Sequence, residues 1–371
     1  MRIGIDAREL CGRATGVGRY LGGLVRAWSE DPVALQHDFV LYAPEPPAVP
    51  LDAARFTTRI VPGPSGTWWE QVRLPRVADE DRLDVFFAPA YTAPLDLDAP
   101  SVVAIHDLSF VAHPEWFRIR EGLRRRWLTR QSAAHAHAVV TISAFSRGEL
   151  IDLLGVPERR IHVIPPGIGP ASSHPSAQAM PGSARHAQPS GAGPASVLFV
   201  GSIFNRRHVP DLIRAFAPIA RTHADASLDL VGDDRSFPRE ALDYTIDVEG
   251  LRGRAHWHQY VTDQQLGDLY ARARAFAFLS EYEGLGLTPL EALAAGVPPV
   301  LLDTPVARES CGDAALYVPV NDRRATTSAL EAVLFDNATR SSLLEAAPAV
   351  LARYDWARAA RDTLAVLVNA R

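Results

Sequence analysis

Residues 280–296, SEYEGLGLTPLEALAAG, decide which fold class the sequence predicts. They follow an apolar run, Phe276–Leu279, that is typical of a buried strand. Thr288, Pro289 and Glu291 then form a capping-box pattern, which predicts that a helix begins here. A strand, a glycine-containing turn and a helix start, in this order, bring backbone N–H groups and the positive end of a helix dipole to the strand's carboxyl end. A phosphate group fits such a place.

Strand-like and helix-like segments alternate on both sides of this stretch. The apolar runs that predict strands are Ile3–Ile5, Phe39–Tyr42, Val85–Phe87, Val102–Ile105, Val139–Ile142, Ile161–Ile164, Val197–Val200, Leu228–Val231, Trp257–Val261, Phe276–Leu279, Val300–Leu302 and Leu316–Val318. Helices are predicted at 17–29, 118–135, 144–154, 210–222, 263–273 and 289–295. This alternation is typical of parallel sheets with helices on both faces. The sequence therefore predicts an α/β protein with two Rossmann-like, doubly wound parallel-sheet domains.

The expected domain boundaries follow from composition. Residues 171–196 are rich in Pro, Ala, Ser and Gly and have no apolar period, so they predict a linker. We expect one domain at 1–170, a second at 197–352, and a helix at 353–371 that could return to the first domain. Ligands of open α/β sheets bind beyond the carboxyl ends of the strands, so two such domains facing each other would form a ligand cleft.

Composition excludes several classes of protein. The chain has 371 residues, of which 47% are hydrophobic and 22% charged, as in ordinary folded proteins of two domains. No run approaches the roughly 18 apolar residues of a transmembrane helix, and the N-terminus lacks the apolar region of a signal peptide. A net charge of −5 gives no general attraction to nucleic acid, and two cysteines are too few for a disulfide framework. We therefore expect a cytoplasmic protein.

Three further loops after predicted strands carry candidate site residues. Arg206 and Arg207 follow one strand, and planar guanidinium groups can neutralise a diphosphate, although an isolated pair is commonly a solvated surface feature. All 38 basic residues are arginines, so a phosphate-binding cation here must be an arginine. Gly16 and Gly18 precede the first helix and allow a ligand to approach the backbone closely. His106 ends another strand, where a lone histidine is more often structural.

Several other features stay open or are set aside. Asp96 and Asp98 form a DxD string of the kind that binds metal, but it precedes a strand and is interpreted as a turn. The incomplete glycine pattern near residue 16 argues against a dinucleotide oxidoreductase. One predicted helix is either a solvated basic helix or a basic and aromatic surface for a membrane interface. Its residues of interest are Trp116, Phe117, Arg118, Arg120, Arg124, Arg125, Arg126, Trp127 and Arg130.

Together these segments resemble glycosyltransferase family 4, whose members are retaining enzymes with the GT-B architecture of two facing domains. The run from Glu283 to Glu291, EGLGLTPLE, is similar to the family's E-x7-E element, and Arg206 with Arg207 takes the place of its Arg-Lys pair. In the first half TGVGRY, WEQ, HDLSF and TISAFSRGEL resemble the mannosyltransferase-like branch. The resemblance covers nearly the whole chain. Its departures, such as Ser202–Asn205 before the arginine pair, leave the donor's identity open.

The resemblance implies a role for each matching position. Glu283 would contact the transferred sugar, His106 would lie near its hydroxyl groups, and Arg206 with Arg207 would hold the diphosphate. Glu291 would bind the ribose in addition to capping its helix. Glu283 caps no helix, so we expect Glu283→Gln to lower kcat and leave Tm nearly unchanged. The other expected donor-binding residues are Gly16, Gly18, Val261, Gly284, Leu285, Gly286, Leu287 and Thr288.

The implied activity is that of a retaining hexosyltransferase, moving mannose from GDP-mannose to a glycan or lipid-linked acceptor in bacterial surface polysaccharide synthesis, such as lipopolysaccharide O-antigen. The alternatives are a donor such as UDP-glucose or dTDP-rhamnose, and a non-catalytic module that binds nucleotide sugars. No cofactor and no metal are expected, because arginines and a helix start can stabilise the leaving diphosphate. Expected partners are the nucleotide sugar and the acceptor, without nucleic acid. Peripheral contact with the cytoplasmic face of the inner membrane stays open.

Overall fold

The computed structural model describes residues 1–12, 15–169 and 195–370 and divides the chain into two compact units. The first unit comprises Met1–Gly167 together with Tyr354–Arg371, and the second comprises Ile168–Arg353. Of the expected linker, only Ala195 and Ser196 lie within the described residues, and Ser196 already begins a strand. In the described part of the chain, no helix is both long and apolar enough to cross a membrane.

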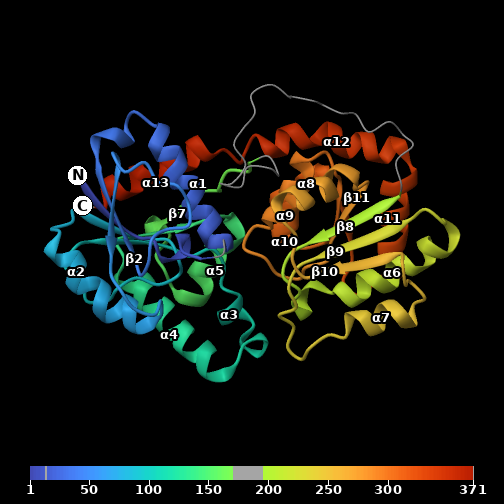
Figure 1. The fold of residues 1–371 in the computed structure, drawn as a ribbon, viewed down its shortest axis with the longest axis horizontal. Helices are drawn as coiled ribbons and strands as arrows, with labels where there is room; N and C mark the ends of the chain where they lie inside the picture. The colour runs from blue at the N-terminus through green and yellow to red at the C-terminus, as the bar shows by residue number, and fades with distance from the viewer. Residues whose placement is uncertain (13–14, 170–194, 371) are drawn as a thin grey trace. The chain divides into compact units, whose positions relative to one another are not determined.

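The first unit is built on a seven-stranded parallel sheet with the strand order β3-β2-β1-β4-β5-β6-β7 (Figure 1). Its strands are β1 (Arg2–Asp6), β2 (Asp38–Ala43), β3 (Phe56–Ile60), β4 (Val85–Ala88), β5 (Ser101–Ala104), β6 (Ala138–Thr141) and β7 (Ile161–Val163). Its helices are α1 (Gly16–Glu30), α2 (Leu74–Glu80), α3 (Ser109–Ala112), α4 (Ile119–His135), α5 (Ala144–Leu154) and α13 (Trp356–Asn369).

Each face of this sheet has its own apolar core. On one face, Phe39 of β2 stacks on Trp28 of α1 with ring centroids 5.2 Å apart, and Phe87 of β4 meets the same indole edge-on at 6.5 Å. Tyr42 and Phe86 point to the other face and pack in one cluster with side chains of α2, α4 and α5. Because both faces are covered, the strands are apolar at nearly every position, and this is why their sequences show as continuous apolar runs.

The second unit repeats the plan with a six-stranded parallel sheet in the order β10-β9-β8-β11-β12-β13. Its strands are β8 (Ser196–Val200), β9 (Ser227–Val231), β10 (Ala255–His258), β11 (Ala275–Phe278), β12 (Pro299–Leu302) and β13 (Leu316–Val318). Its helices are α6 (Val209–Thr222), α7 (Leu242–Val248), α8 (Asp263–Arg272), α9 (Leu287–Ala294), α10 (Pro305–Cys311), α11 (Arg323–Phe335) and α12 (Asn337–Leu351).

The strand order of the second unit sets the place of its ligand site. β8 and β11 are neighbours, with Val197 opposite Ala275, yet the chain leaves β8 toward β9 on one side and reaches β12 from β11 on the other. The loops after β8 and β11 therefore diverge and leave room between them at the carboxyl edge of the sheet. This reversal of strand order is where open α/β sheets bind ligands.

Both predicted sheets are confirmed, with two differences of detail. The strand expected at Trp257–Val261 is β10, which ends earlier because the chain turns there toward Thr262, the residue whose side chain caps α8. The capping box of Thr262 and Gln265 predicted for that helix is confirmed. The sequence did not predict β3, because this edge strand buries only Phe56 and so shows no apolar run.

Helix α13 packs in the first unit through a tryptophan held between two glycines. A Cβ atom on Gly23 of α1 would lie 2.5 Å from ring atoms of Trp356, and one on Gly167 would lie 2.3 Å from Cγ of the same indole. Nearby, the Trp28 indole N–H donates to the Ala360 carbonyl at 2.9 Å. The bare backbone at Gly23 and Gly167 thus makes the seat for Trp356.

We expect Gly23→Ala to lower Tm by several degrees. Overpacking of this kind costs about 1–3 kcal/mol, and about 1 kcal/mol corresponds to roughly 2–4 °C in domains of 150–250 residues. Gly22→Ala is the matched control in the same helix, because its Cβ would lie 3.9 Å from a Leu10 methyl group, an ordinary contact. Calorimetry should show a lowered Tm for the Gly23 variant only. A Gly23→Ala protein with the wild-type Tm would contradict the proposed packing. The packing would also be contradicted if Gly23→Ala lowered Tm equally in a Trp356→Ala background.

Candidate functional site

The turn after β11 ends in a glycine that starts helix α9. Gly286 has a φ of +82° and occupies the N-cap position, so the helix begins at Leu287. No side chain caps this helix end, and the expected capping box of Thr288 and Glu291 is therefore wrong. The glycine turn at Gly286 and the Thr288–Glu291 pattern were both compatible with a helix start. The left-handed glycine starts the helix two residues earlier than a Thr288 cap would. The backbone N–H groups of the first turn consequently have no side-chain cap.

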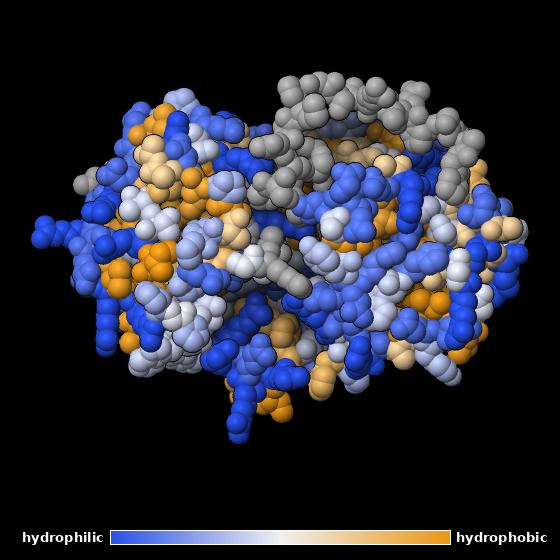
Figure 2. All heavy atoms as spheres, viewed as in Figure 1, coloured by the Kyte–Doolittle hydropathy of each residue, from blue (hydrophilic) through white to orange (hydrophobic). Residues whose placement is uncertain are grey.

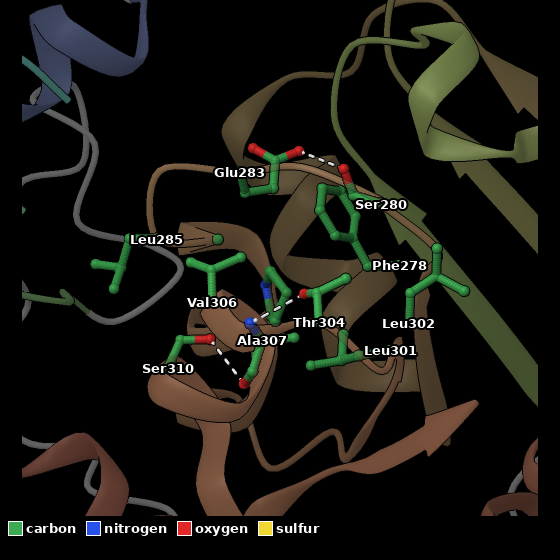
Figure 3. A pocket seen from close by; sticks show the side chains of 12 residues that line it. Phe278, Ser280, Glu283, Leu285, Leu301, Leu302, Thr304, Val306, Ala307 and Ser310 are labelled. Carbon is green, nitrogen blue, oxygen red and sulfur yellow. Dashed lines mark hydrogen bonds between the residues drawn. The ribbon is translucent and has the colours of Figure 1, made fainter. Parts of the chain in front are cut away.

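This helix start opens into a pocket of about 270 Å³, which includes space open to solvent. Glu283, Leu285 and Gly286 line one part of it, and Thr304 and Ala307 at the start of α10 line another. Figure 3 shows Glu283 and Ser280 pointing toward each other at the edge of this pocket. The side chain of Thr304 accepts a hydrogen bond from the Ala307 N–H, so α10, unlike α9, has a side-chain cap.

Arg207 and Glu283 form an ion pair between the loops that follow β8 and β11. The Glu283 Oε1 atom lies 2.7 Å from Arg207 Nη2 and accepts from Arg207 Nε at 2.8 Å and from the Ser280 hydroxyl at 2.9 Å. The two side chains are only 13% and 18% exposed. Glu283 thus has a structural role that the sequence did not predict, because its carboxylate balances a largely buried guanidinium, and this argues against the expectation that Glu283→Gln leaves Tm nearly unchanged.

The surroundings of Arg207 fix its position. Its Nη1 donates to the Ser202 carbonyl at 2.8 Å, and the guanidinium lies over the Phe278 ring at 4.9 Å. A Cβ atom on Gly201, whose φ is +149°, would lie 2.7 Å from Arg207 Nη1. Gly201, which directly follows β8, thus leaves space for the Arg207 guanidinium.

Arg206 is placed differently from its neighbour. Its guanidinium lies 4.3 Å from the Phe204 ring centroid, and its backbone carbonyl accepts from the Glu281 N–H at 2.9 Å. Both arginines belong to the 3₁₀ turn Asn205–Arg207. The pair is thus not two equivalent cations, since the charge of Arg207 is balanced by Glu283 within the protein.

Three further ionisable residues, which the sequence did not predict, lie near the carboxyl edge of the second sheet. They are His208, Glu240 and Glu281. His208 has a φ of +48° before α6, and its Nε2 lies 2.5 Å from a Glu281 carboxylate oxygen. Burial, and then the nearby Asp234, raises the pKa of Glu240 to about 7. The Asn205 side chain donates to one oxygen of Glu240 at 3.3 Å. No local motif marks these residues, because only the fold brings them together.

Not every expected donor-binding residue of the second unit lies at this pocket. Leu285 and Gly286 line it together with Glu283, whereas Val261 and Glu291 are not among its lining residues. Val261 precedes the cap of α8 and is half-buried. Gly284, Leu287 and Thr288 are part of the same turn and helix start. Their proposed roles stay predictions.

In the first unit, His106 follows β5 and is buried. Its Nε2 lies 2.8 Å from the Pro89 carbonyl, so this nitrogen carries the hydrogen, and its ring meets Tyr20 and Tyr91 edge-on at 4.6 and 5.5 Å. Burial lowers the pKa of His106, which keeps the imidazole neutral. Burial alone would raise the pKa of the adjacent Asp107, but hydrogen bonds from Ser109 and Tyr91 hold it below its usual value. His106 is thus a neutral ring next to an ionised carboxylate.

The two glycines of the first loop have different surroundings. A Cβ on Gly18 would lie 2.4 Å from the Glu9 carbonyl oxygen, whereas a Cβ on Gly16 would meet nothing within 4 Å. The Gly18 N–H donates at 2.9 Å to the Thr15 hydroxyl, which caps α1 and itself donates to Glu9 at 2.8 Å. Packing therefore explains Gly18, and Gly16 is the residue that leaves open space.

No metal-binding group stands out in residues 1–12, 15–169 and 195–370, where no cluster of three His, Cys, Asp or Glu side chains could hold an ion. Asp96 and Asp98 lie in the loop between β4 and β5, and the Asp98 N–H donates to the Asp79 carboxylate at 3.2 Å. This loop has the turn-like form expected from the sequence.

The fold, two α/β units that are each built on a parallel sheet, is the GT-B architecture. Residues 14–172 match the model of Glycosyltransferase Family 4, and residues 183–350 match that of Glycosyl transferases group 1. The two matches divide nearly the whole chain between them. The chain belongs to glycosyltransferase family 4.

The chain is also similar to individual proteins. The O-antigen chain mannosyltransferase B of Escherichia coli is 27% identical over 76% of this chain and 73% of its own length. The glycogen synthase of Mycobacterium tuberculosis is 28% identical over 76% of this chain and 66% of its own length. The solved sucrose-phosphate synthase of Thermosynechococcus elongatus has a TM-score of 0.76 and 17% identity, over 99% of this chain and 98% of that one, and so shares the fold.

We expect the Arg207–Glu283 pair to stabilise the second unit. Glu283→Gln leaves the Arg207 charge unbalanced in a largely buried place and should lower Tm, because breaking such a pair is costly. A double-mutant cycle with Arg207→Gln should give a coupling of about 1–3 kcal/mol.

The control for this cycle is the exposed pair Asp303 and Arg308, whose side chains are 49% and 55% exposed. Its coupling should be smaller than that of the Arg207–Glu283 pair, because solvent screens an exposed ion pair. Denaturant unfolding followed by circular dichroism would measure both cycles. Equal small couplings for the two pairs would show that the pair at the pocket carries no special stability.

Proposed function

We propose that this glycosyltransferase transfers a hexose, namely mannose from GDP-mannose, to a glycan or lipid-linked acceptor in bacterial surface polysaccharide synthesis. The observation that carries the proposal is the arrangement at the carboxyl edge of the second sheet. There Glu283 and the start of α9, which has no side-chain cap, line one pocket, and Arg207 of the arginine turn pairs with Glu283. The name of the E. coli relative, an O-antigen mannosyltransferase, supports mannose and a surface glycan.

The proposed donor position follows from charge. The first-turn N–H groups of α9 and the positive end of its dipole favour an anion at Gly286. Arg206 would supply the formal positive charge for the diphosphate. Arg207 would act mainly by holding Glu283 and would share its charge with the donor's phosphate. Glu283, held in place by this pair, would face the sugar, where positive charge develops as the glycosidic bond to phosphate breaks.

The proposed reaction retains the configuration of the sugar and needs no metal ion. The leaving nucleoside diphosphate gains negative charge in the transition state, and prearranged positive groups stabilise that charge most where they need not reorganise. Arginine and helix N–H groups can do this. Attack from the face that the phosphate leaves, with the phosphate accepting the acceptor's proton, would give retention without a covalent enzyme intermediate.

The alternative donor is a glucose nucleotide, such as UDP-glucose, and the name of the glycogen synthase relative supports glucose as the sugar. The protein should therefore be tested with GDP-mannose, UDP-glucose and dTDP-rhamnose side by side. We expect GDP-mannose to raise Tm most, because a ligand at about 100 times its Kd stabilises the native state by roughly 2.7 kcal/mol. The Tm shift should persist in EDTA. Transfer of mannose to a mannan-type acceptor should also persist in EDTA. NMR of the product should show a retained anomeric configuration.

Each other outcome has a defined meaning. A larger shift with UDP-glucose would replace mannose by glucose in the proposal. If the protein binds the donor but neither hydrolyses it nor transfers its sugar to any glycan, the protein is a non-catalytic module. Complete loss of turnover in EDTA, with recovery on addition of Mg²⁺ or Mn²⁺, would overturn metal independence.

Substitutions of Arg206 and Glu291 should affect different steps, the first the chemical step and the second the binding of the donor. Arg206→Ala should lower kcat by about 10²–10³, because removal of one donor to a developing oxyanion has cost this much in other enzymes. Glu291→Gln should raise the donor KM with little change of kcat, because a ribose contact is the same in ground and transition states. Glu345→Gln on the exposed face of α12 is the matched control. An unchanged KM for Glu291→Gln would remove the proposed ribose contact.

A further inference from the structure

The arginine turn of the second unit ends in a histidine with a left-handed backbone. His208 has a φ of +48° and a ψ of +38° and occupies the N-cap position of α6, yet its side chain caps no backbone N–H there. This conformation is uncommon for residues other than glycine, and it persists only where the surroundings hold it. Such outliers gather at functional sites. The contacts of the His208 side chain show what holds it.

The His208 ring lies between two carboxylates that come from different elements. Its Nε2 atom lies 2.5 Å from a Glu281 oxygen in the loop after β11, and its Nδ1 atom lies 3.2 Å from an Asp211 oxygen on α6. An ionised carboxylate only accepts hydrogen bonds, and a neutral imidazole has a single N–H. Both contacts are therefore hydrogen bonds only when the ring carries two protons and a positive charge.

Three consecutive residues after β8 contact the same short segment after β11. The Arg206 carbonyl accepts from the Glu281 N–H at 2.9 Å. The Arg207 guanidinium pairs with Glu283 at 2.7 Å. The third contact is that of His208 with the Glu281 carboxylate. Histidine is the side chain that changes its charge near neutral pH, so only the third contact depends on pH in that range.

Backbone groups hold the other end of the arginine turn. The Asn205 Oδ1 atom accepts from the Phe237 N–H at 2.6 Å, and its Nδ2 atom donates to the Pro238 carbonyl at 2.9 Å. The same Nδ2 atom also donates to a Glu240 oxygen at 3.3 Å. The turn is thus fixed at its start mainly by backbone groups and at its end by the charged contacts of His208.

Two other charged groups act on this arrangement. Arg214 donates to the second Asp211 oxygen at 2.9 Å and so shares that carboxylate with His208. Burial, and then the nearby Asp234, raises the pKa of Glu240 to about 7, and the charge of His208 opposes this shift. Glu240 therefore changes its charge in the same pH range as an ordinary histidine, and a test of His208 needs a control for it.

A charged contact is not unusual on the second unit. Figure 2 shows that most of its visible surface is hydrophilic, with hydrophobic residues in small groups. An ion pair on such a surface usually contributes little. The contact of His208 differs because its ring is only 18% exposed and because it directly follows the turn that contains Arg206 and Arg207.

We propose that His208 is a positioning residue for the diphosphate of the nucleotide-sugar donor, because its ring fixes the end of the arginine turn against Glu281. The proposal rests on the proposed function, in which Arg206 supplies positive charge to the diphosphate, and it adds a dependence of that site on pH. At low pH the protonated ring holds both carboxylates. As the pH rises, one ring nitrogen loses its hydrogen, one of the two contacts is lost, and the turn is fixed less firmly. Donor binding therefore weakens as the pH rises.

The test measures the Kd of the donor by titration calorimetry at about pH 6 and about pH 8.5, on either side of the range in which histidine titrates. The donor used is the one of GDP-mannose, UDP-glucose and dTDP-rhamnose that raises Tm most. Both phosphates of each donor are diesters, so the donor's charge is the same at the two pH values. We expect the wild-type Kd to be about five- to tenfold higher at the higher pH.

Two substitutions of His208 should remove this pH dependence in opposite ways. His208→Asn keeps a side chain that tolerates the left-handed backbone but cannot become charged, so the donor should bind weakly at both pH values. His208→Arg keeps a positive charge at both pH values, so the donor should bind at both as tightly as it binds to wild type at the lower pH. A merely structural role of the ring would not give this rescue by arginine.

The chain offers two matched controls. His223→Asn makes the same substitution at the other end of α6, where the ring stacks on Phe335 with centroids 3.9 Å apart. Glu240→Gln removes the other group that titrates near neutral pH. Both controls should keep the wild-type dependence of donor binding on pH. Circular dichroism verifies that each variant is folded.

A measurement without donor tests the His208–Glu281 contact itself. A double-mutant cycle of His208→Asn and Glu281→Gln, measured by denaturant unfolding, gives the coupling of the two side chains. We expect a larger coupling at about pH 6 than at about pH 8.5, because a contact that needs a proton stabilises the fold only while that proton is bound.

Three results would overturn the role of His208. They are an equal wild-type Kd at both pH values, an unchanged pH dependence in His208→Asn, and a coupling to Glu281 that does not vary with pH. Loss of the pH dependence in Glu240→Gln alone would assign the response to Glu240 instead. If none of the three donors binds at either pH, the proposed donor site itself is wrong. Donor binding that is insensitive to pH overturns only the role of His208, so the two failures are distinguishable.

Discussion

The ion pair of Arg207 and Glu283 is the contact on which the pocket of the second unit depends. It joins the loops after β8 and β11, which the Glu281 N–H to Arg206 carbonyl bond and the His208–Glu281 contact also link. Gly201 gives the guanidinium its space, the Phe278 ring lies beneath it, and the Ser280 hydroxyl holds the carboxylate. The helix start at Gly286 follows Glu283 directly, so the position of this glutamate also determines where the α9 N–H groups point.

The pair also explains how two adjacent arginines come to differ. In water two guanidinium groups side by side would be equivalent, but burial makes a balancing charge necessary for the one that is enclosed. Arg207 has that balance in Glu283, and Arg206 rests on an aromatic ring at the turn. Arg207 therefore has a fixed carboxylate partner, whereas the contact shown for the Arg206 guanidinium is with a neutral ring.

The sequence predicted both sheets, and it placed Glu283, Gly286 and the arginine pair in loops after strands, because these features are written in local patterns. The Arg207–Glu283 contact could not be read in the same way, since its residues are 76 positions apart and only the strand order brings them together. The start of α9 was misplaced because two valid helix-start signals, Thr288 with Glu291 and Gly286, compete within a few residues. His208 and Glu240 carry no local signature at all.

The seat of Trp356 between Gly23 and Gly167 has a consequence for synthesis on the ribosome. Trp28 donates its indole hydrogen bond to a residue 332 positions further along the chain, so the first unit lacks one of its helices until almost all of the chain has emerged. At about 5–20 residues per second the wait is on the order of 20–60 s. The second unit is continuous in sequence and has no such delay. The part of the protein that is made first is therefore the part that is completed last.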